Sequence, residues 1–202
     1  MSVFVVAVLG RKVSTRRSRD VMNRKTTEPD GQLFSGANHI CIVTADLDSA
    51  VRRCWDRYRI GPWRVFSYDG SNMKGTTDGE DFEVKMRAAL APLGATFRIE
   101  IIEPMDERSV YAEALRRRGG ADHVHHVRLD VPDFERTRRK LMSLGIPVRM
   151  DAQFAGGSTD GPRLRGIYFD ATDYLGCLLE IADVPPGFSM PEPDYVYPSD
   201  AQ

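Results

Sequence analysis

The chain has 202 residues, 42% of them hydrophobic and 28% charged, which is the composition of an ordinary globular protein long enough to bury a core. Its formal net charge of -1 gives no excess of positive charge with which to bind nucleic acid. No apolar run approaches the roughly 20 residues needed to span a bilayer. We therefore expect neither a nucleic-acid partner nor a membrane partner. The three cysteines lack metal-type spacing and suit a reducing cytoplasm.

The two ends of the chain differ from its middle. Residues 2–10 are apolar and residues 11–25 are strongly basic, which is the reverse of the order in a secretory signal. We expect residues 1–33 to be a leader, disordered or peripheral, with a transit sequence and a start at Met22 as alternatives. Residues 184–202 carry five prolines and two tyrosines. This tail is expected to be neither helix nor central strand, and to lie on the surface or across a partner subunit.

Two similar stretches suggest an internal repeat. One apolar run starts at His39, and the stretch 122–131 holds the other three histidines. Seven residues after His39 and after His126 stands an aspartate, Asp46 or Asp133, that can cap a helix. Apolar residues at helical spacing follow each aspartate, more weakly after Asp133, and each helix ends at glycine and proline.

Short strand-like runs complete each half. They are expected at 64–68, 83–91 and 97–102, then at 148–150, 164–169 and 177–182, with loops at 69–81, 155–162 and 170–176 and a linking helix near 109–118. Each half thus has the order βαβββ, as module 38–105 and module 122–183. Because one such module is too small to bury its sheet, we predict a single α+β domain over 34–183. Its two paired modules form one curved mixed sheet around a cleft, with the helices outside.

Each half also places a carboxylate inside an apolar strand, Glu100 in the first and Glu180 in the second. With His39 and His126, they form a set that suits Zn, Co, Ni, Mn or Fe(II). Neighbours on a strand point to opposite faces, and the repeat selects His126 over His125. His125 would then share the other face with His123 as an exposed pair. The alternative for each residue singly is a solvent-facing glutamate or a structural histidine.

The stretches 38–43, 99–104, 119–127 and 175–180 resemble the vicinal oxygen chelate superfamily of glyoxalase I, methylmalonyl-CoA epimerase, extradiol dioxygenases and resistance proteins. The resemblance covers roughly residues 33–184. It implies the paired βαβββ fold, a homodimer and one divalent metal ion. The metal ligands would be His39, Glu100, His126 and Glu180.

Within the superfamily the order of motifs is most similar to the methylmalonyl-CoA epimerase branch, which has a glutamate base upstream. Glu83 falls near that position, although Val84-Lys85 replaces the expected residues. Arg98 and Arg128 share strand faces with Glu100 and His126, and they favour a carboxylate- or phosphate-bearing small substrate, with surface ion pairs as the alternative.

The resemblance implies proton abstraction next to a metal-chelated carbonyl through an enediolate, as in an epimerase or isomerase, with Glu83 or Glu180 as the base. Three alternatives stay open: a glyoxalase I-type lyase, an Fe(II) extradiol dioxygenase, and a non-catalytic binding or resistance protein. A fourth protein ligand disfavours the dioxygenase.

Overall fold

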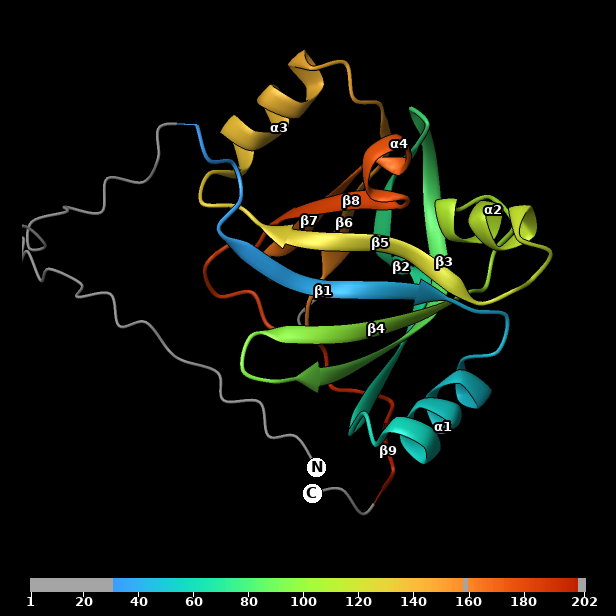
Figure 1. Cartoon of the computed structure of the whole chain (residues 1–202). Coiled ribbons are helices and arrows are strands. Elements are labelled where there is room, and N and C mark those ends of the chain that lie inside the picture. Colours follow the sequence, from blue (N-terminus) through green and yellow to red (C-terminus); the bar gives the residue numbers. More distant parts are fainter. Residues whose placement is uncertain (1–30, 158–159, 200–202) are drawn as a thin grey trace, which may run out of the picture. The chain divides into compact units, whose positions relative to one another are not determined.

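Thirteen helices and strands follow one another in the part of the chain that this computed structural model describes, residues 31–157 and 160–199 (Figure 1). Residues 1–30 of the predicted leader 1–33, including the alternative start at Met22, lie outside the described residues. None of the helices in the described ranges has the length and apolar character that a membrane span requires.

Each half of the chain has the predicted βαβββ order. The first half contains β1 (Gly36–Val43), α1 (Leu47–Tyr58), β2 (Trp63–Thr77), β3 (Glu80–Leu93) and β4 (Phe97–Pro104), and α2 (Val110–Arg117) links it to the second. The second half contains β5 (His123–Asp130), α3 (Phe134–Ser143), β6 (Val148–Ala155), β7 (Arg163–Phe169), α4 (Thr172–Leu175) and β8 (Leu178–Asp183). Strand β9 (Tyr195–Tyr197) lies in the tail. The short helix α4 occupies the predicted loop 170–176.

The two repeat helices begin as predicted. The carboxylate of Asp46 accepts a hydrogen bond from the Ser49 amide at 3.0 Å, and that of Asp133 accepts one from the Arg136 amide at 2.9 Å. These bonds satisfy backbone N–H groups that have no partner inside the helix. Equivalent caps at equivalent positions confirm the repeat that the sequence predicts.

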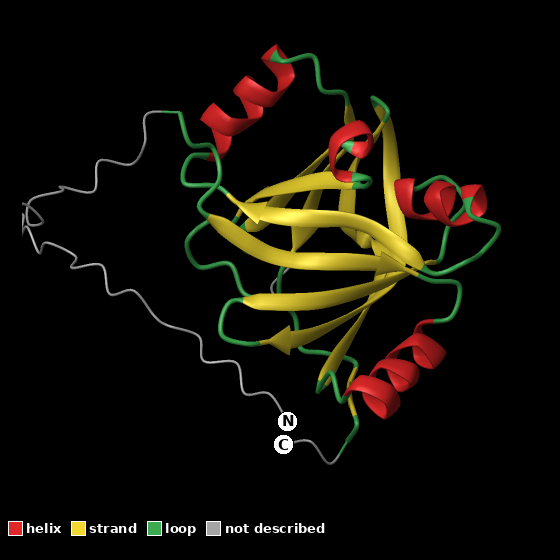
Figure 2. Cartoon of the chain, in the orientation of Figure 1, coloured by secondary structure: helices red, strands yellow, loops and turns green. Residues whose placement is uncertain are grey.

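The strands form one mixed sheet in the order β3-β4-β1-β5-β8-β7-β6-β2-β9, and an additional β2–β3 pairing closes it. The two halves meet at two antiparallel pairs, β1–β5 and β2–β6. Figure 2 shows the helices α1 to α4 on the outside of the strands. The predicted α+β fold, a curved mixed sheet of two paired modules with outer helices, is therefore confirmed.

The predicted loop 69–81 is wrong. These residues extend β2 and β3 into a long hairpin that turns at Asp78 and Gly79, both of which have positive φ, 50° and 86°. Such a turn matches the twist of the flanking strands. Gly70 and Gly75 made the stretch resemble a loop, but both lie within β2.

Gly75 lies where the two halves touch. A Cβ atom at this position would lie 2.1 Å from the Asp151 carbonyl oxygen and 2.6 Å from the Ala152 Cα atom on β6. Both are backbone atoms, so no rotamer change relieves the overlap. The glycine is required because the β2 and β6 backbones approach closely here.

Gly75→Ala is expected to lower the free energy of unfolding by about 1–3 kcal/mol, because β6 must shift to admit the methyl group. Urea denaturation followed by circular dichroism measures the change. Gly36→Ala is the matched control, since its Cβ would contact only side-chain atoms of Asp130, the Oδ2 atom at 3.4 Å and the Cβ atom at 4.0 Å. Equal stability of the two variants would contradict the close approach.

The proline-rich tail adds β9 to the edge of the sheet, with Trp63 paired to Tyr197 and Val65 to Tyr195. The Tyr195 hydroxyl donates to the Asp48 carboxylate and accepts from Arg87 Nη2 at 3.1 Å. The tail thus lies along its own domain as an edge strand, in agreement with the exclusion of a central strand.

Candidate metal centre and its cavity

The pairing of β1 with β5 brings the two predicted histidine ligands together. His39 is the register partner of Arg128, and Cys41 is that of His126. The Nε2 atoms of His39 and His126 lie 3.1 Å apart, and both side chains are buried. Residues 87 positions apart in the sequence therefore meet at the junction of the two modules, as the repeat predicts.

The two predicted carboxylates arrive from the strands beside β1 and β5. Glu100 lies on β4, which runs parallel to β1, and Glu180 lies on β8, which runs parallel to β5. Glu180 Oε2 is 3.2 Å from both Nε2 atoms, and Glu100 Oε2 is 3.4 Å from both. We call these four residues the His/Glu cluster.

The geometry of the His/Glu cluster fits a divalent ion. Ligands about 2.1 Å from one ion lie about 3.0 Å apart in an octahedron and about 3.4 Å apart in a tetrahedron, close to the spacings found here. Glu180 Oε2 is buried and accepts no hydrogen bond from any described residue, although two imidazole nitrogens lie beside it. A buried carboxylate oxygen of this kind needs a cation, either a protonated imidazole or a metal ion, and a mixed nitrogen and oxygen donor set suits Zn, Co, Ni, Mn or Fe(II).

The charges of the His/Glu cluster depend on one another. Burial raises the pKa of Glu180, but His126, His39 and Arg128 outweigh burial and hold this pKa well below its usual range. Burial also raises the pKa of Glu100, and His39 and His126 lower it overall. Burial lowers the pKa of His126, whereas Glu100 and Glu180 raise it to about 9. At neutral pH, without metal, both carboxylates are ionised and His126 carries a second proton.

Metal binding at pH 7 is therefore expected to release about one proton, because Nε2 of His126 must lose its proton to become a ligand. Since the pKa of His126 is raised to about 9, apparent affinity should rise about tenfold per pH unit below that value and level off above it. Calorimetric titration with Zn²⁺ in two buffers of different ionisation enthalpy counts the protons. An affinity independent of pH between 6 and 8 would contradict this charge state.

His125 does not lie where the sequence predicts. The β1–β5 register shifts between Cys41 and Ile42, whose partners are His126 and Val124, so His125 is the extra residue of a bulge. The bulge cancels the alternation of faces, and His125 is buried rather than exposed. His123 is only half-buried, with its Nδ1 atom 2.8 Å from the Ala121 carbonyl. The predicted exposed pair is therefore wrong.

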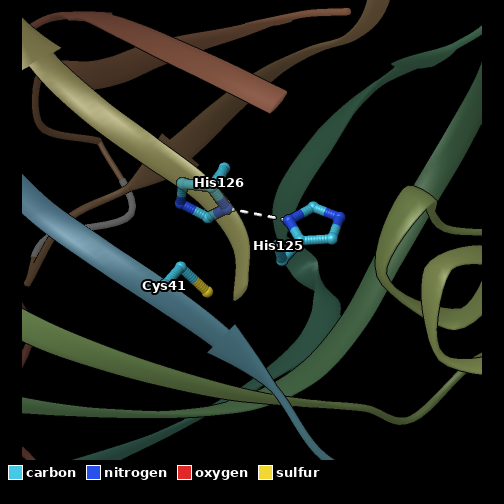
Figure 3. A group of neighbouring side chains, drawn as sticks. All are labelled: Cys41, His125 and His126. Atoms are coloured by element: carbon cyan, nitrogen blue, oxygen red, sulfur yellow. Dashed lines mark hydrogen bonds between the residues drawn. The ribbon is translucent and has the colours of Figure 1, made fainter. Parts of the chain in front are cut away.

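Cys41, His125 and His126 form a second group of potential ligands (Figure 3). All three side chains are buried, and the Nδ1 atoms of the two histidines lie 2.8 Å apart in a hydrogen bond. Burial and Glu100 raise the pKa of the Cys41 thiol well above its usual range, and a protonated thiol is a poor ligand. The His/Glu cluster is therefore the better candidate centre.

A cavity of about 690 Å³ opens beside the His/Glu cluster. His39, Glu100 and Glu180 line it together with Arg98 and Arg128. Its other walls are largely aromatic and apolar, and they include Phe66, Tyr68, Tyr111, Phe154, Tyr168, Phe188 and Met190. A cavity with a few charged groups in an apolar lining is typical of a small-molecule site.

The two predicted substrate-binding arginines both reach this cavity. Arg128 is the register partner of His39 on one side and of Glu180 on the other. Its Nε atom is buried and has no hydrogen-bond partner among the described residues. Arg98 donates to Asn38 Oδ1 at 2.9 Å. A third arginine, Arg64, also lines the cavity and carried no signal in the sequence.

Glu83 lies away from the other predicted site residues. Its side chain is 61% exposed on β3 and lies 4.0 Å from Lys74 Nζ, in a separate surface depression. The next residue, Val84, is buried, and neighbouring strand residues face opposite sides. Glu83 is therefore not placed to act as the base. Glu100, Asp130 and Glu180 are the carboxylates among the described residues that line the cavity.

Two contributors to the cavity escaped the sequence reasoning. The Tyr111 and Tyr168 hydroxyls are hydrogen-bonded at 2.9 Å, and the Tyr168 ring packs edge-on against His126. The tail supplies Val184, Phe188, Met190 and Pro191 as one wall. The unusual number of tail prolines was the only sequence signal for that wall, because its contacts depend on where the tail crosses the domain.

Comparison with known proteins agrees with this fold. The model of the Glyoxalase/Bleomycin resistance protein/Dioxygenase superfamily matches residues 38–163. Among curated proteins, none matches the chain.

Solved structures include similar folds. The methylmalonyl-CoA epimerase of Mycobacterium tuberculosis has 24% identity and a TM-score of 0.54, over 76% of this chain and 91% of the epimerase. A variant Streptomyces coelicolor methylmalonyl-CoA epimerase in complex with 2-nitronate-propionyl-CoA has 18% identity and a TM-score of 0.52, over 74% of this chain and 96% of that one. At these identities the likeness shows a shared fold. With the family match over most of the folded part, it follows that the chain belongs to the glyoxalase/bleomycin resistance protein/dioxygenase superfamily, also known as the vicinal oxygen chelate superfamily.

Proposed function

We propose that this protein is a divalent-metal-dependent isomerase or epimerase that moves a proton next to a substrate carbonyl. The observation that carries the proposal is the His/Glu cluster beside a substrate-sized cavity, in which the two Nε2 atoms lie 3.1 Å apart and each lies 3.2 Å from Glu180 Oε2 and 3.4 Å from Glu100 Oε2. A bound divalent ion would polarise the carbonyl and make the neighbouring C–H acidic. Co, Ni, Zn and Mn are the expected ions.

Glu180 is the proposed base. It lines the cavity, and its pKa below the usual range keeps the carboxylate ionised at neutral pH, the form that a base must have. The Oε2 atom is directed to the histidines, which leaves Oε1, next to Gly166, for the proton transfer. Burial in an apolar setting strengthens the basicity of such an oxygen once the substrate excludes water.

Arg128 and Arg98 are proposed to bind a carboxylate of the substrate. An arginine with an unpaired buried Nε can complete its hydrogen bonds with an anion, and a planar guanidinium suits a carboxylate. The Streptomyces relative was solved with an acyl-CoA analogue. We therefore include short acyl-CoA thioesters with a carboxylate among the candidate substrates.

A glyoxalase I-type lyase is the second candidate, and one observation favours it. With Glu83 on the surface, Glu180 is left as the proposed base on one side of the substrate. A single carboxylate returns a proton most easily to the face from which it took it. If the proton returns to the adjacent carbon on that face, the reaction is an isomerisation. Epimerisation requires that the proton be delivered to the opposite face of the same carbon.

Metal analysis of protein purified without added metal is the first test. Co, Ni, Zn or Mn supports the proposal, Fe points to the dioxygenase chemistry, and a metal-free protein that binds none of these ions points to a binding protein. Solvent-deuterium incorporation then separates the proton-transfer reactions, with 2-substituted acyl thioesters and 2-oxo aldehydes as substrates. No exchange with any of these compounds would overturn the proposal. Homodimer formation and a cytoplasmic location stay predictions, and sedimentation analysis tests the first.

A further inference from the structure

We propose that His125 is a positioning residue that fixes the ring of His126, so that Nδ1 of His126 keeps its proton and Nε2 faces the metal centre. The inference rests on the proposed metal site and concerns a side chain outside the ligand set. It starts from the bulge that places two consecutive histidines on one side of β5, within hydrogen-bond distance of each other (Figure 3).

The hydrogen bonds of a neutral His125 imidazole fit one arrangement of protons. Its Nε2 atom lies 3.3 Å from the carbonyl oxygen of Val110, at the start of α2. A carbonyl only accepts, so Nε2 of His125 carries the proton, and a neutral imidazole has no second proton for Nδ1. Nδ1 of His125 therefore accepts, and Nδ1 of His126, 2.8 Å away, donates. The remaining nitrogen of His126, Nε2, is the atom that meets His39, Glu100 and Glu180.

The contacts of His125 suit a neutral imidazole. The residue is 4% exposed, and its ring packs against Tyr111 with the centroids 4.7 Å apart. Its hydrogen-bond partners among the described residues are a carbonyl and an imidazole, so no anion there compensates a charge on the ring. Burial without a carboxylate partner disfavours the protonated imidazole, whereas the neutral form still makes both hydrogen bonds.

The first module contains the same arrangement, with an asparagine in place of the histidine. The register also shifts between Ala37 and His39, which makes Asn38 the extra residue of a second bulge. Asn38 Oδ1 lies 3.3 Å from Nδ1 of His39. Arg98 Nη1 donates to that oxygen, and Asn38 Nδ2 donates to Asp130, so the oxygen is the accepting atom. Each ligand histidine is thus preceded by a bulge residue that accepts from its Nδ1.

The acceptors at Nδ1 matter for metal binding at Nε2. A metal-binding histidine usually donates its second ring N–H to an acceptor that sets its tautomer and orientation, and loss of that acceptor typically weakens metal affinity about 10- to 100-fold. In this chain an imidazole takes the place of the usual carboxylate or carbonyl. It transmits the position of α2, through Val110, to the ring of His126.

NMR of ¹⁵N-labelled protein tests the arrangement directly, with and without Zn²⁺. We expect His125 to be the Nε2–H tautomer, His126 to keep a proton on Nδ1 in both states, and a through-hydrogen-bond coupling to join the two Nδ1 nitrogens. A protonated Nδ1 on His125, or an unprotonated Nδ1 on His126, would overturn the inference. This measurement needs no substrate.

A pair of substitutions of similar size separates positioning from packing. His125→Asn retains an acceptor and copies Asn38, whereas His125→Leu fills the space without one. We expect Zn²⁺ affinity, measured by competition with a chelator, to fall about 10- to 100-fold in His125→Leu and to stay within about 3-fold of the unmodified protein in His125→Asn. Equal affinities in the two variants would overturn the inference.

His123→Leu is the control, because His123 bonds to the Ala121 carbonyl and lies outside the hydrogen bonds of His126. Melting temperatures of all variants show whether each is folded. If the unmodified protein binds no divalent metal, the proposed function fails, and the NMR result still decides the role of His125. If metal binds but His125→Leu binds as tightly as His125→Asn, the proposed function stands and the inference fails.

Discussion

Glu180→Gln is expected to lower kcat/KM by about 1000-fold or more and to reduce the metal content of the purified protein. The substitution keeps the size of the side chain but removes the charge of a ligand and of the proposed base. Metal-assisted stabilisation of a developing enediolate contributes several kcal/mol, and each 1.4 kcal/mol corresponds to a tenfold change in rate. Metal analysis and steady-state kinetics measure the two effects.

Glu83→Gln is the matched control for this experiment. It makes the same chemical change on another strand of the same sheet, but at a side chain that is 61% exposed and lies outside the cavity. We expect its kcat/KM to stay within about 2-fold of the unmodified protein, since surface substitutions away from such sites are usually mild. A large loss in Glu83→Gln, or none in Glu180→Gln, would reverse the assignment of the base.

Arg128→Met is expected to lower kcat/KM about 100-fold for a carboxylate-bearing substrate. Methionine retains most of the length of the side chain, so the loss isolates the guanidinium, whose buried Nε lacks a protein partner. Loss of a desolvated arginine from a hydrogen-bonded charge pair costs about 2–5 kcal/mol. Kinetics with the substrate and with its amide or methyl ester measure the preference for the carboxylate.

The amide or methyl ester of the substrate distinguishes two roles for Arg128. If Arg128 binds the substrate carboxylate, the variant loses its preference for the acid over the ester. If Arg128 only stabilises the charge of Glu180, both substrates lose activity equally, and that result would contradict the proposed binding role. Arg57→Met, on the exposed face of α1, controls for the change of net charge and is expected to leave both substrates unaffected.

The sequence alone was sufficient to predict the repeat and the four members of the His/Glu cluster. His39 and His126 are each the fourth residue of equivalent strands, Glu100 and Glu180 lie in equivalent apolar strands, and both repeat helices start at an aspartate. These features are local, because a helix cap or an apolar strand depends on residues close in the chain. The pairing of the halves followed because neither could bury its own sheet.

Only the tertiary structure decided which face each neighbouring residue occupies. His125 is buried because a bulge against β1 cancels the alternation of faces, and Glu83 is exposed because β3 places Val84 inside. The hairpin 69–81 is held because residues 73–77 of its first arm, on β2, pair with β6, a strand from the other module. The tail forms part of the cavity wall because of where it crosses the domain. Each of these outcomes depends on contacts between residues far apart in the chain, and strand register is set by partners that a local pattern does not contain.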